Sequence, residues 1–355
     1  EPDLKQLVTG NNTFALDLYS ILKKEKGNLF LSPYSISSAL AMTYGGARGD
    51  TAKEMAEVLH FELGMDRTHP AFAELDTVFN EIQKKGDIQL HIANSLWPQK
   101  GYPLLPEYLT LIKQHYDVSI TPVDYVKATE QARQIINIWV KKKTKGKIKD
   151  IIHQEALNCL TTLVLVNVIY FKGKWASPFD FKRTAKSDFS LSEDSKIRIP
   201  MMYQTGTFDY AKIKGAELLK LPYLGNKLSM VIILPEKVEG LSEIETRFTE
   251  KNLEAWLSRL SRQSVKVYLP KFKITQGTFD LKQPLQASGM RKAFSADADF
   301  SGIEETKNLF IGPVLHKAFV EVNEEGTEAA AATGVMMSTT SVEITPPPVF
   351  RADHP

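Results

Sequence analysis

The stretch Glu324–Pro348, which reads EEGTEAAAATGVMMSTTSVEITPPP, decides how this sequence is interpreted. It follows a predicted strand, and its three closing prolines prevent either a helix or a sheet from continuing. A connection of about 20 residues is too long for a simple turn and is typical of a functional loop. The simplest alternatives are a flexible surface loop or a short alanine-rich helix.

Charge is segregated within this loop by a period of two residues. One face is uncharged and small to apolar, and it consists of Thr327, Ala329, Ala331, Thr333, Val335 and Met337. Glu328 falls on the opposite face. A loop that needed only solubility would not separate its charge in this way. The pattern therefore indicates a segment that can enter a sheet with a clean inward face.

The composition is that of a globular protein. The chain has 355 residues, of which 43% are hydrophobic and 24% charged, and its formal net charge is +2. This balance excludes a disordered chain and the broad basic field that nucleic-acid binding needs. The single cysteine, Cys159, excludes an internal disulfide, and we expect it to be buried. No window reaches the roughly 18 apolar residues of a membrane helix. The first residue is not methionine, and we expect either that a leader was removed or that the chain was trimmed.

Helical patterns dominate the first third of the chain and strand patterns the rest. Ser32-Pro33 predicts a helix start, and Thr51 with Glu54 has the spacing of a capping box. The predicted strands are 28–31, 163–171, 228–234, 265–274 and 315–322. His316 shares a face with Ala318 and Val320, so it should point inward. This order favours one large α+β domain.

Motifs of the common enzymes are missing from the sequence: it has no Gly-x-Ser-x-Gly, no phosphate-binding loop and no His-Glu-x-x-His. The histidines show no metal-ligand spacing, so we expect neither a metal nor a cofactor. The lysines between Lys141 and Lys149 could bind a polyanion, but interleaved Ile138, Trp139, Ile148 and Ile151 favour a solvated helix face with an apolar underside.

The chain resembles the serpins, the serine protease inhibitor family, over essentially its whole length. The matching motifs follow the order of the family: NLFLSPYSIS at 28–37, TYGGARGDT at 43–51, LVNVIYFKGKWASPF at 165–179, PMMY at 200–203, YLPKFKI at 268–274, ADFSGI at 298–303, LHKA at 315–318, the hinge at 324–334 and FRADHP at 350–355.

This resemblance implies a single serpin domain over residues 1–355, with about three β-sheets, roughly nine helices and a mobile reactive loop at about 324–348. The family continues for two further core strands, which are missing after Pro355. A serpin is a metastable suicide substrate. A protease cleaves its loop and forms an acyl-enzyme, and the cut loop then inserts into the central sheet before deacylation.

Several residues match family sites, and their roles are implied by the resemblance. The inhibitory hinge corresponds to Glu324, Glu325, Gly326, Thr327, Glu328, Ala329, Ala330, Ala331 and Ala332. Ser32, Ser35, Asn167 and His316 match the shutter, a polar network that lets the central strands part, although Ser32 also reads as a plain helix cap. Trp175 matches the breach, the point where insertion begins.

The reactive bond is implied by its distance from the hinge. The usual spacing places it between Thr340 and Ser341, with Met336, Met337 or Ile344 as alternatives. Residues 324–350 contain no lysine, arginine or aspartate. Trypsin-like proteases and caspases are therefore poor targets, whereas elastase-like or subtilisin-like proteases with small apolar pockets remain.

The expected partner is thus a serine, or alternatively a cysteine, endopeptidase held in a covalent acyl complex by a monomeric inhibitor. No enzymatic activity is expected. A non-inhibitory serpin that acts as a carrier or chaperone-like protein is the main alternative, and an unrecognised hydrolase is the third. We expect a secreted or cell-envelope protein, with the cytoplasm as the alternative compartment.

Overall fold

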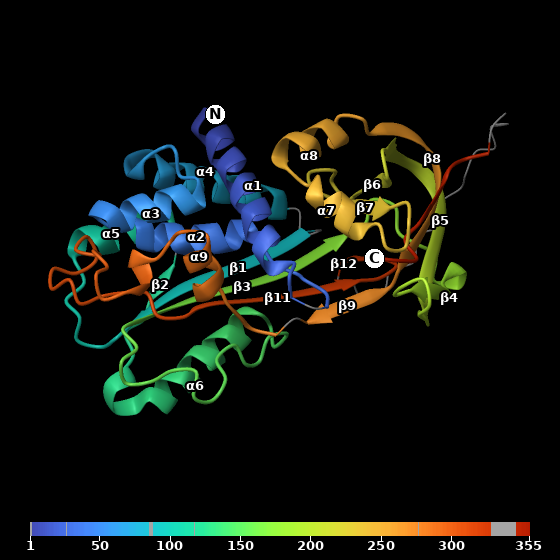
Figure 1. Ribbon diagram of the computed structural model, residues 1–355. Coiled ribbons are helices and arrows are strands. Elements are labelled where there is room, and N and C mark those ends of the chain that lie inside the picture. Colours follow the sequence, from blue (N-terminus) through green and yellow to red (C-terminus); the bar gives the residue numbers. More distant parts are fainter. Residues whose placement is uncertain (1, 26, 85–87, 117, 276, 328–345) are drawn as a thin grey trace. The chain divides into compact units, whose positions relative to one another are not determined.

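The computed structural model describes residues 2–25, 27–84, 88–116, 118–275, 277–327 and 346–355 (Figure 1). The chain groups into two compact units. Unit 1 comprises residues 1–81, 90–170 and 275–319, and unit 2 comprises residues 82–89, 171–274 and 320–355. The single domain over 1–355 stays a prediction.

Nine α-helices occur in the described residues. They are α1 (Pro2–Leu22), α2 (Pro33–Tyr44), α3 (Gly49–Leu59), α4 (Met65–Gln83), α5 (Pro106–His115), α6 (Tyr125–Lys143), α7 (Leu241–Thr246), α8 (Glu250–Leu257) and α9 (Lys282–Ala287). None of the helices in this part of the chain is long and apolar enough to cross a membrane.

The strands of unit 1 centre on a parallel pair. They are β1 (Ile88–Pro98), β2 (Ser119–Ile120), β3 (Leu163–Lys174), β10 (Phe279–Asp280) and β11 (Val314–Val322). Residues 165–170 of β3 pair directly with residues 314–319 of β11. β1 lies on the other side of β3, and β10 pairs with β11. β3 and β11 both run on into unit 2.

Both faces of the β3–β11 pair are covered, which explains the continuous apolar run in the sequence. Leu163 and Leu165 join the core that contains α2. Val164 and Val166 alternate with them and pack under α6 and the segment that follows it. Figure 1 shows α6 beside β3 and β11 within this unit. The residues between β3 and α2 therefore lie in a packed interior.

Local signals at the helix starts were only partly informative. Ser32 caps α2, and its hydroxyl accepts a hydrogen bond from the Ser35 amide, which confirms that prediction. The prediction of a capping box at the start of α3 is wrong. Arg48 occupies its cap position. Thr51 instead accepts from the Asp299 amide, and Glu54 accepts from the amides of residues 291 and 292.

Two other sequence predictions fail in unit 1. Residues 28–31 form no strand. Cys159 is exposed rather than buried, because it lies in the connection before β3 rather than in the strand itself. In the lysine-rich region, Ile148 and Ile151 are buried as predicted, whereas Ile138 is 67% exposed.

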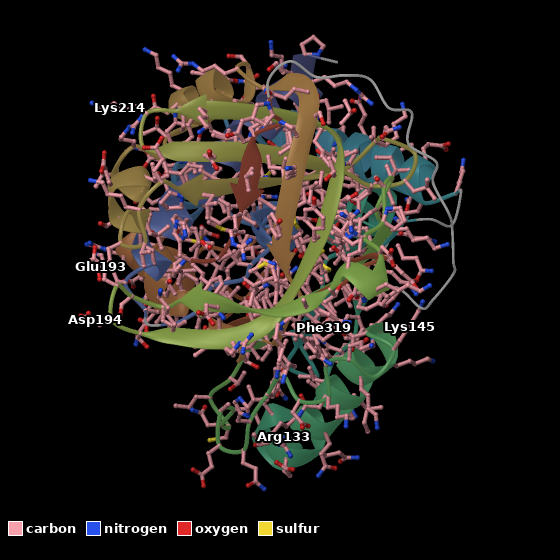
Figure 2. All side chains as sticks on the ribbon, turned by 90° about the vertical axis from the view of Figure 1, so that its right-hand side faces the viewer. Arg133, Lys145, Glu193, Asp194, Lys214 and Phe319 are labelled. Carbon is pink, nitrogen blue, oxygen red and sulfur yellow. The ribbon has the colours of Figure 1, made fainter. Side chains whose placement is uncertain are left out.

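Unit 2 is built around one long strand. Its strands are β4 (Ala185–Ser190), β5 (Lys196–Ile213), β6 (Ala216–Pro222), β7 (Ser229–Pro235), β8 (Ser261–Pro270), β9 (Phe272–Thr275), β12 (Gly326–Thr327) and β13 (Val349–Arg351). β5 pairs with β4, β6 and β8. Figure 2 shows Glu193 and Asp194 in the turn between β4 and β5. Because β5 joins all these partners, the described strands form two sheets where about three were expected.

A stack of four side chains crosses β5, β8 and β13 in unit 2. Arg183 lies over the ring of Tyr203 at 4.2 Å, and the centroid of that ring is 4.6 Å from that of Tyr268. Arg351 covers the other face of Tyr268 at 4.3 Å. Such cation–π contacts contribute about 0.5–1 kcal/mol each at exposed sites. The stack therefore holds β13 against β8.

Candidate functional site

The first cluster of site residues lies in unit 1, between the β3–β11 pair and α2. Asn167 of β3 and His316 of β11 are direct register partners, and both are at most 1% exposed. Ser32 and Ser35 stand at the start of α2. The structure brings these four predicted residues together in one hydrogen-bonded network, which we call the shutter cluster.

Asn167 is the centre of this network. Its amide nitrogen donates to the Ser35 carbonyl at 2.9 Å and also contacts the Ser35 hydroxyl and Asn94 Oδ1. Asn94, in turn, donates to Ser38 Oγ at 3.3 Å. Sequence reasoning missed Asn94. The available signal was an amide side chain within the strand pattern of β1, which must find a partner when it is buried.

The contacts of His316 fix its protonation state. Asn167 Oδ1 can only accept, so His316 Nδ1 donates to it. His316 Nε2 accepts from the Ser32 backbone amide at 3.3 Å. One nitrogen donates and the other accepts, so the ring is neutral. Complete burial lowers the pKa of His316 to about 3. Protonation would turn Nε2 into a donor that faces another donor.

The second cluster lies in unit 2, where Trp175 holds the segment that precedes the loop. The Trp175 indole donates to the Asn323 carbonyl at 3.0 Å, and its backbone amide donates to the Glu325 carbonyl at 2.8 Å. The indole also stacks on Tyr223, with ring centroids 4.8 Å apart. We call Trp175, Tyr223 and residues 323–327 the breach cluster.

Glu324 carries a buried carboxylate within the breach cluster. Its side chain is 2% exposed, and it accepts from Lys271 Nζ at 3.0 Å and from Thr184 Oγ1 at 2.9 Å. Burial raises the pKa of Glu324, but hydrogen bonds from its own amide, Lys271 and Thr184 outweigh burial, and the pKa falls below its usual value. The charged carboxylate is therefore fixed in place rather than exposed on a loop.

β12 completes the breach cluster. Thr327 is fully buried, and its hydroxyl lies 2.8 Å from that of Tyr223. The strand pairs antiparallel with the end of β3 on one side and with the end of β11 on the other. A Cβ atom on Gly326 would lie 2.0 Å from the Gly173 carbonyl oxygen, so only glycine fits here. Gly326 and Thr327 of the hinge are thus already part of a sheet.

The remaining predicted positions lie outside the described residues. They are Glu328, Ala329, Ala330, Ala331, Ala332, Met336, Met337, Thr340, Ser341 and Ile344. In the described ranges, no group of three or more histidine, cysteine, aspartate or glutamate side chains is arranged to hold a metal ion.

Comparisons with known proteins agree with this geometry. The chain matches the model of the family described as "Serpin (serine protease inhibitor)" over residues 9–355. It is 43% identical over 363 residues to the Leukocyte elastase inhibitor of Bos taurus, which covers 99% of this chain and 94% of that protein. Uncleaved ovalbumin superimposes with a TM-score of 0.88 at 31% identity, covering 98% of this chain and 94% of that chain. Human Thyroxine-binding globulin has a TM-score of 0.89 at 31% identity, covering 99% and 93%. The chain therefore belongs to the serpin family, and its fold is the metastable serpin fold.

Proposed function

We propose that this protein is a suicide-substrate inhibitor of serine endopeptidases with small apolar primary pockets, and that it has no catalytic activity of its own. A relative that is 43% identical bears the name Leukocyte elastase inhibitor. The loop 324–350 offers no lysine, arginine or aspartate to an acidic or caspase-like pocket. Cysteine endopeptidases that form acyl-enzymes with similar pockets are further targets.

One observation carries the mechanism: β12 already lies between the ends of β3 and β11. Gly326 pairs with Lys174, and Thr327 pairs with Gly173. Farther along the same two strands, β3 and β11 pair directly with each other. β12 is therefore the first step of a strand whose continuation would separate β3 from β11.

The register of β12 predicts where each loop residue goes on insertion. Because β12 and β3 are antiparallel, each later loop residue would pair with the residue one position earlier in β3. Residues 328–337 would therefore pair with β3 from Lys172 to Leu163, its first residue. The uncharged face of the loop ends at the same place, at Met337. A reactive bond at Thr340–Ser341 lies just beyond this inserted length.

On insertion, the same register would bring Thr333 between Asn167 and His316. Continuing from the pairs Thr327–Gly173 and Thr327–Val322, Thr333 falls opposite both residues. It shares the face of Thr327, as do Asn167 and His316. Its hydroxyl would therefore replace the hydrogen bond between these two side chains. A small polar residue suits this position, because both of its neighbours need a partner after they separate.

The test is a protease challenge of the intact protein. Pancreatic elastase and subtilisin should each give a covalent complex that survives denaturing electrophoresis. Mass spectrometry of the carboxyl-terminal fragment, separated under denaturing conditions, should find Ser341 at its amino terminus. Trypsin should give no complex. If the proteases cleave the loop but no covalent complex forms at any enzyme-to-inhibitor ratio, the proposed inhibitory function is wrong.

A carrier function is the second candidate, favoured by the similarity to human Thyroxine-binding globulin. The protease challenge separates the candidates, because a carrier would simply be clipped and a hydrolase would turn over a substrate. The small uncharged face of the loop favours the inhibitor, since a carrier has no need for side chains that can enter a packed interior.

A further inference from the structure

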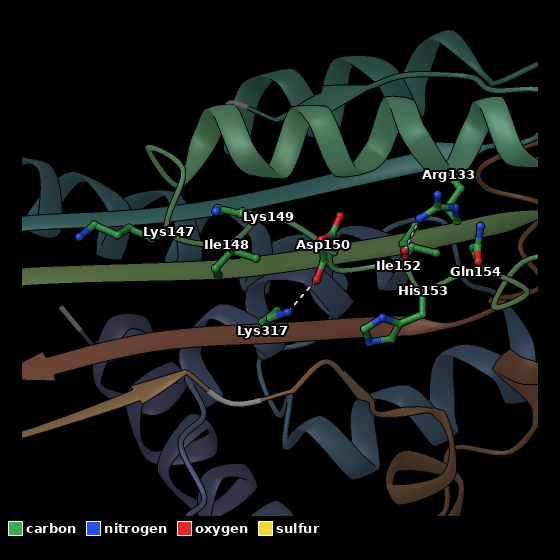
Figure 3. Close-up of a pocket in the computed structure, with 9 residues that line it drawn as sticks. All are labelled: Arg133, Lys147, Ile148, Lys149, Asp150, Ile152, His153, Gln154 and Lys317. Atoms are coloured by element: carbon green, nitrogen blue, oxygen red, sulfur yellow. Dashed lines mark hydrogen bonds between the residues drawn. The ribbon is translucent and has the colours of Figure 1, made fainter.

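Unit 1 contains an open pocket that the inhibitory mechanism does not use. Its volume is about 560 Å³, and it is lined by Arg133 of α6, by residues 147–154 of the segment after α6, and by Lys317 of β11. Figure 3 shows these side chains around the space between that segment and β11. Figure 2 shows Arg133 on α6 and Lys145 in the turn beyond its end.

The fold brings lysines from two distant parts of the sequence to this pocket. Ile148 and Ile152 are buried against the sheet and belong to the same core as Leu315. Their burial leaves Lys147 and Lys149 on the outer side of the segment. Lys317 lies two residues after Leu315, so it projects from the same face of β11. Lys141, Lys142 and Lys143 lie exposed at the end of α6, as the simplest interpretation of the lysines predicts, whereas Lys147 and Lys149 lie beyond the helix.

Direct contacts hold the wall of the pocket in place. Lys317 Nζ donates to the Asp150 carbonyl at 2.7 Å, and Lys147 Nζ lies 5.4 Å from the centre of the Phe319 ring. Arg133 donates to the Ile152 carbonyl at 2.9 Å. The segment is therefore tied to α6 on one side and to β11 on the other.

The pocket carries an excess of positive charge. The guanidinium of Arg133 is matched by the Glu130 carboxylate, with two contacts of 2.7 Å. Lys149 and Lys317 then face one carboxylate of the lining, that of Asp150. Burial lowers the pKa of Lys317, and the Asp150 charge opposes this effect. An anion that approached Lys317 would compensate the desolvation of its ammonium group.

We propose that this pocket binds a small phosphate-type oxyanion with two or more negative charges, such as pyrophosphate. Lysine ammonium groups act as point charges and are established phosphate binders. The His153 ring adds a nitrogen on the same wall, and the volume falls in the usual range for small ligands.

Such an anion would also affect loop insertion, a consequence that rests on the proposed function. It would bridge Lys149, after α6, to Lys317 on β11. β11 must separate from β3 when the loop enters between them. A bound anion would therefore tether β11 and slow insertion, so that more of the inhibitor is cleaved without trapping its protease.

Calorimetric titration of the intact protein with sodium pyrophosphate at 0.15 M ionic strength tests the site. The double variant Lys149→Gln/Lys317→Gln should weaken binding at least tenfold. The matched control Lys142→Gln/Lys214→Gln removes two exposed lysines outside the pocket and should weaken it less than threefold. If the first double variant is unstable, Lys149→Gln alone should still weaken binding at least threefold. The absence of binding to the wild type, or an equal loss in the control, would overturn the site.

A second measurement separates this site from the proposed function. The number of inhibitor molecules consumed per elastase inactivated should rise with pyrophosphate in the wild type and in the control, but not in Lys149→Gln/Lys317→Gln. If this ratio of inhibitor to elastase does not change when pyrophosphate is bound to the wild type, the proposal that the anion restrains β11 is wrong. If the wild type binds pyrophosphate but does not inhibit elastase even without it, the proposed function is contradicted and the anion site is still supported.

Discussion

The neutral ring of His316 makes the stability of this protein depend on pH in a way that one substitution should remove. Its pKa is about 3 in the folded state, against 6.5 for the unperturbed side chain. Between these values the unfolded chain binds more protons than the native one, so the free energy of unfolding decreases as the pH falls from 6.5 toward 3. The full effect corresponds to about 5 kcal/mol, of which about 2 kcal/mol is lost between pH 7.5 and pH 5.

His316→Gln is the informative variant. Its amide can donate to Asn167 Oδ1 and accept from the Ser32 amide, which are the two bonds that the imidazole makes, but it does not titrate. The first unfolding transition in urea should be followed at pH 7.5 and pH 5 for both proteins. The loss of stability on acidification should be about 2 kcal/mol smaller in the variant.

His69 provides the internal control. Burial lowers its pKa to about 4, so it also destabilises the native state in acid, but it is present in both proteins and its contribution cancels in the difference. If His316→Gln loses as much stability as the wild type between pH 7.5 and pH 5, the assigned protonation state is wrong.

Three further predictions concern the loop. Thr327→Arg should turn the inhibitor into a substrate, because it places a charge at a fully buried position of β12, whereas Glu328→Arg, on the opposite face, should retain most complex formation in gel assays with elastase. Cleavage between residues 336 and 345 should raise the melting temperature, since the inserted strand satisfies all its backbone groups; coincident melting curves of cut and intact protein would argue against insertion. Thr340→Arg should create a stable trypsin complex whose carboxyl-terminal fragment, separated under denaturing conditions, begins at Ser341, and simple degradation by trypsin would place the reactive bond elsewhere.

The sequence predicted the parts of the fold that depend on periodicity. The apolar run that begins at Leu163 became β3, and the two-residue period correctly turned His316 inward. Ser32 and Pro33 marked the start of α2 because a cap and a first-turn proline act locally. These signals need no knowledge of distant parts of the chain.

The local predictions failed where backbone amides from a distant segment bound the oxygen atoms that the prediction had assigned to a local partner. Thr51 and Glu54 have the spacing of a capping box, but their oxygens accept from amides in the segment 291–299. Asn94 joined the shutter cluster through contacts with residues far away in the sequence. Neither outcome can be obtained from local spacing, because a hydrogen bond across the fold replaces the local one.

For the hinge, the sequence predicted that the segment could join a sheet but not where the strand begins. The alternation from Thr327 onward indicated a segment able to join a sheet. It did not indicate that Gly326 and Thr327 already pair with β3 and β11 in the described state. That depends on Trp175 and Tyr223, which bind the preceding residues and fix where the strand begins.

The anchoring of β13 has a practical consequence for the cleaved molecule. Phe350 is fully buried, β13 pairs with β8, and Arg351 closes the four-membered stack while also donating to Ser187 Oγ. A cut before residue 346 leaves all these contacts intact. The short fragment should therefore remain bound without a covalent link, and nicked and uncut protein should elute together in gel filtration unless a denaturant is present. Mass under native conditions is a poor reporter of cleavage in this protein, and only denaturing separation can count the cut molecules.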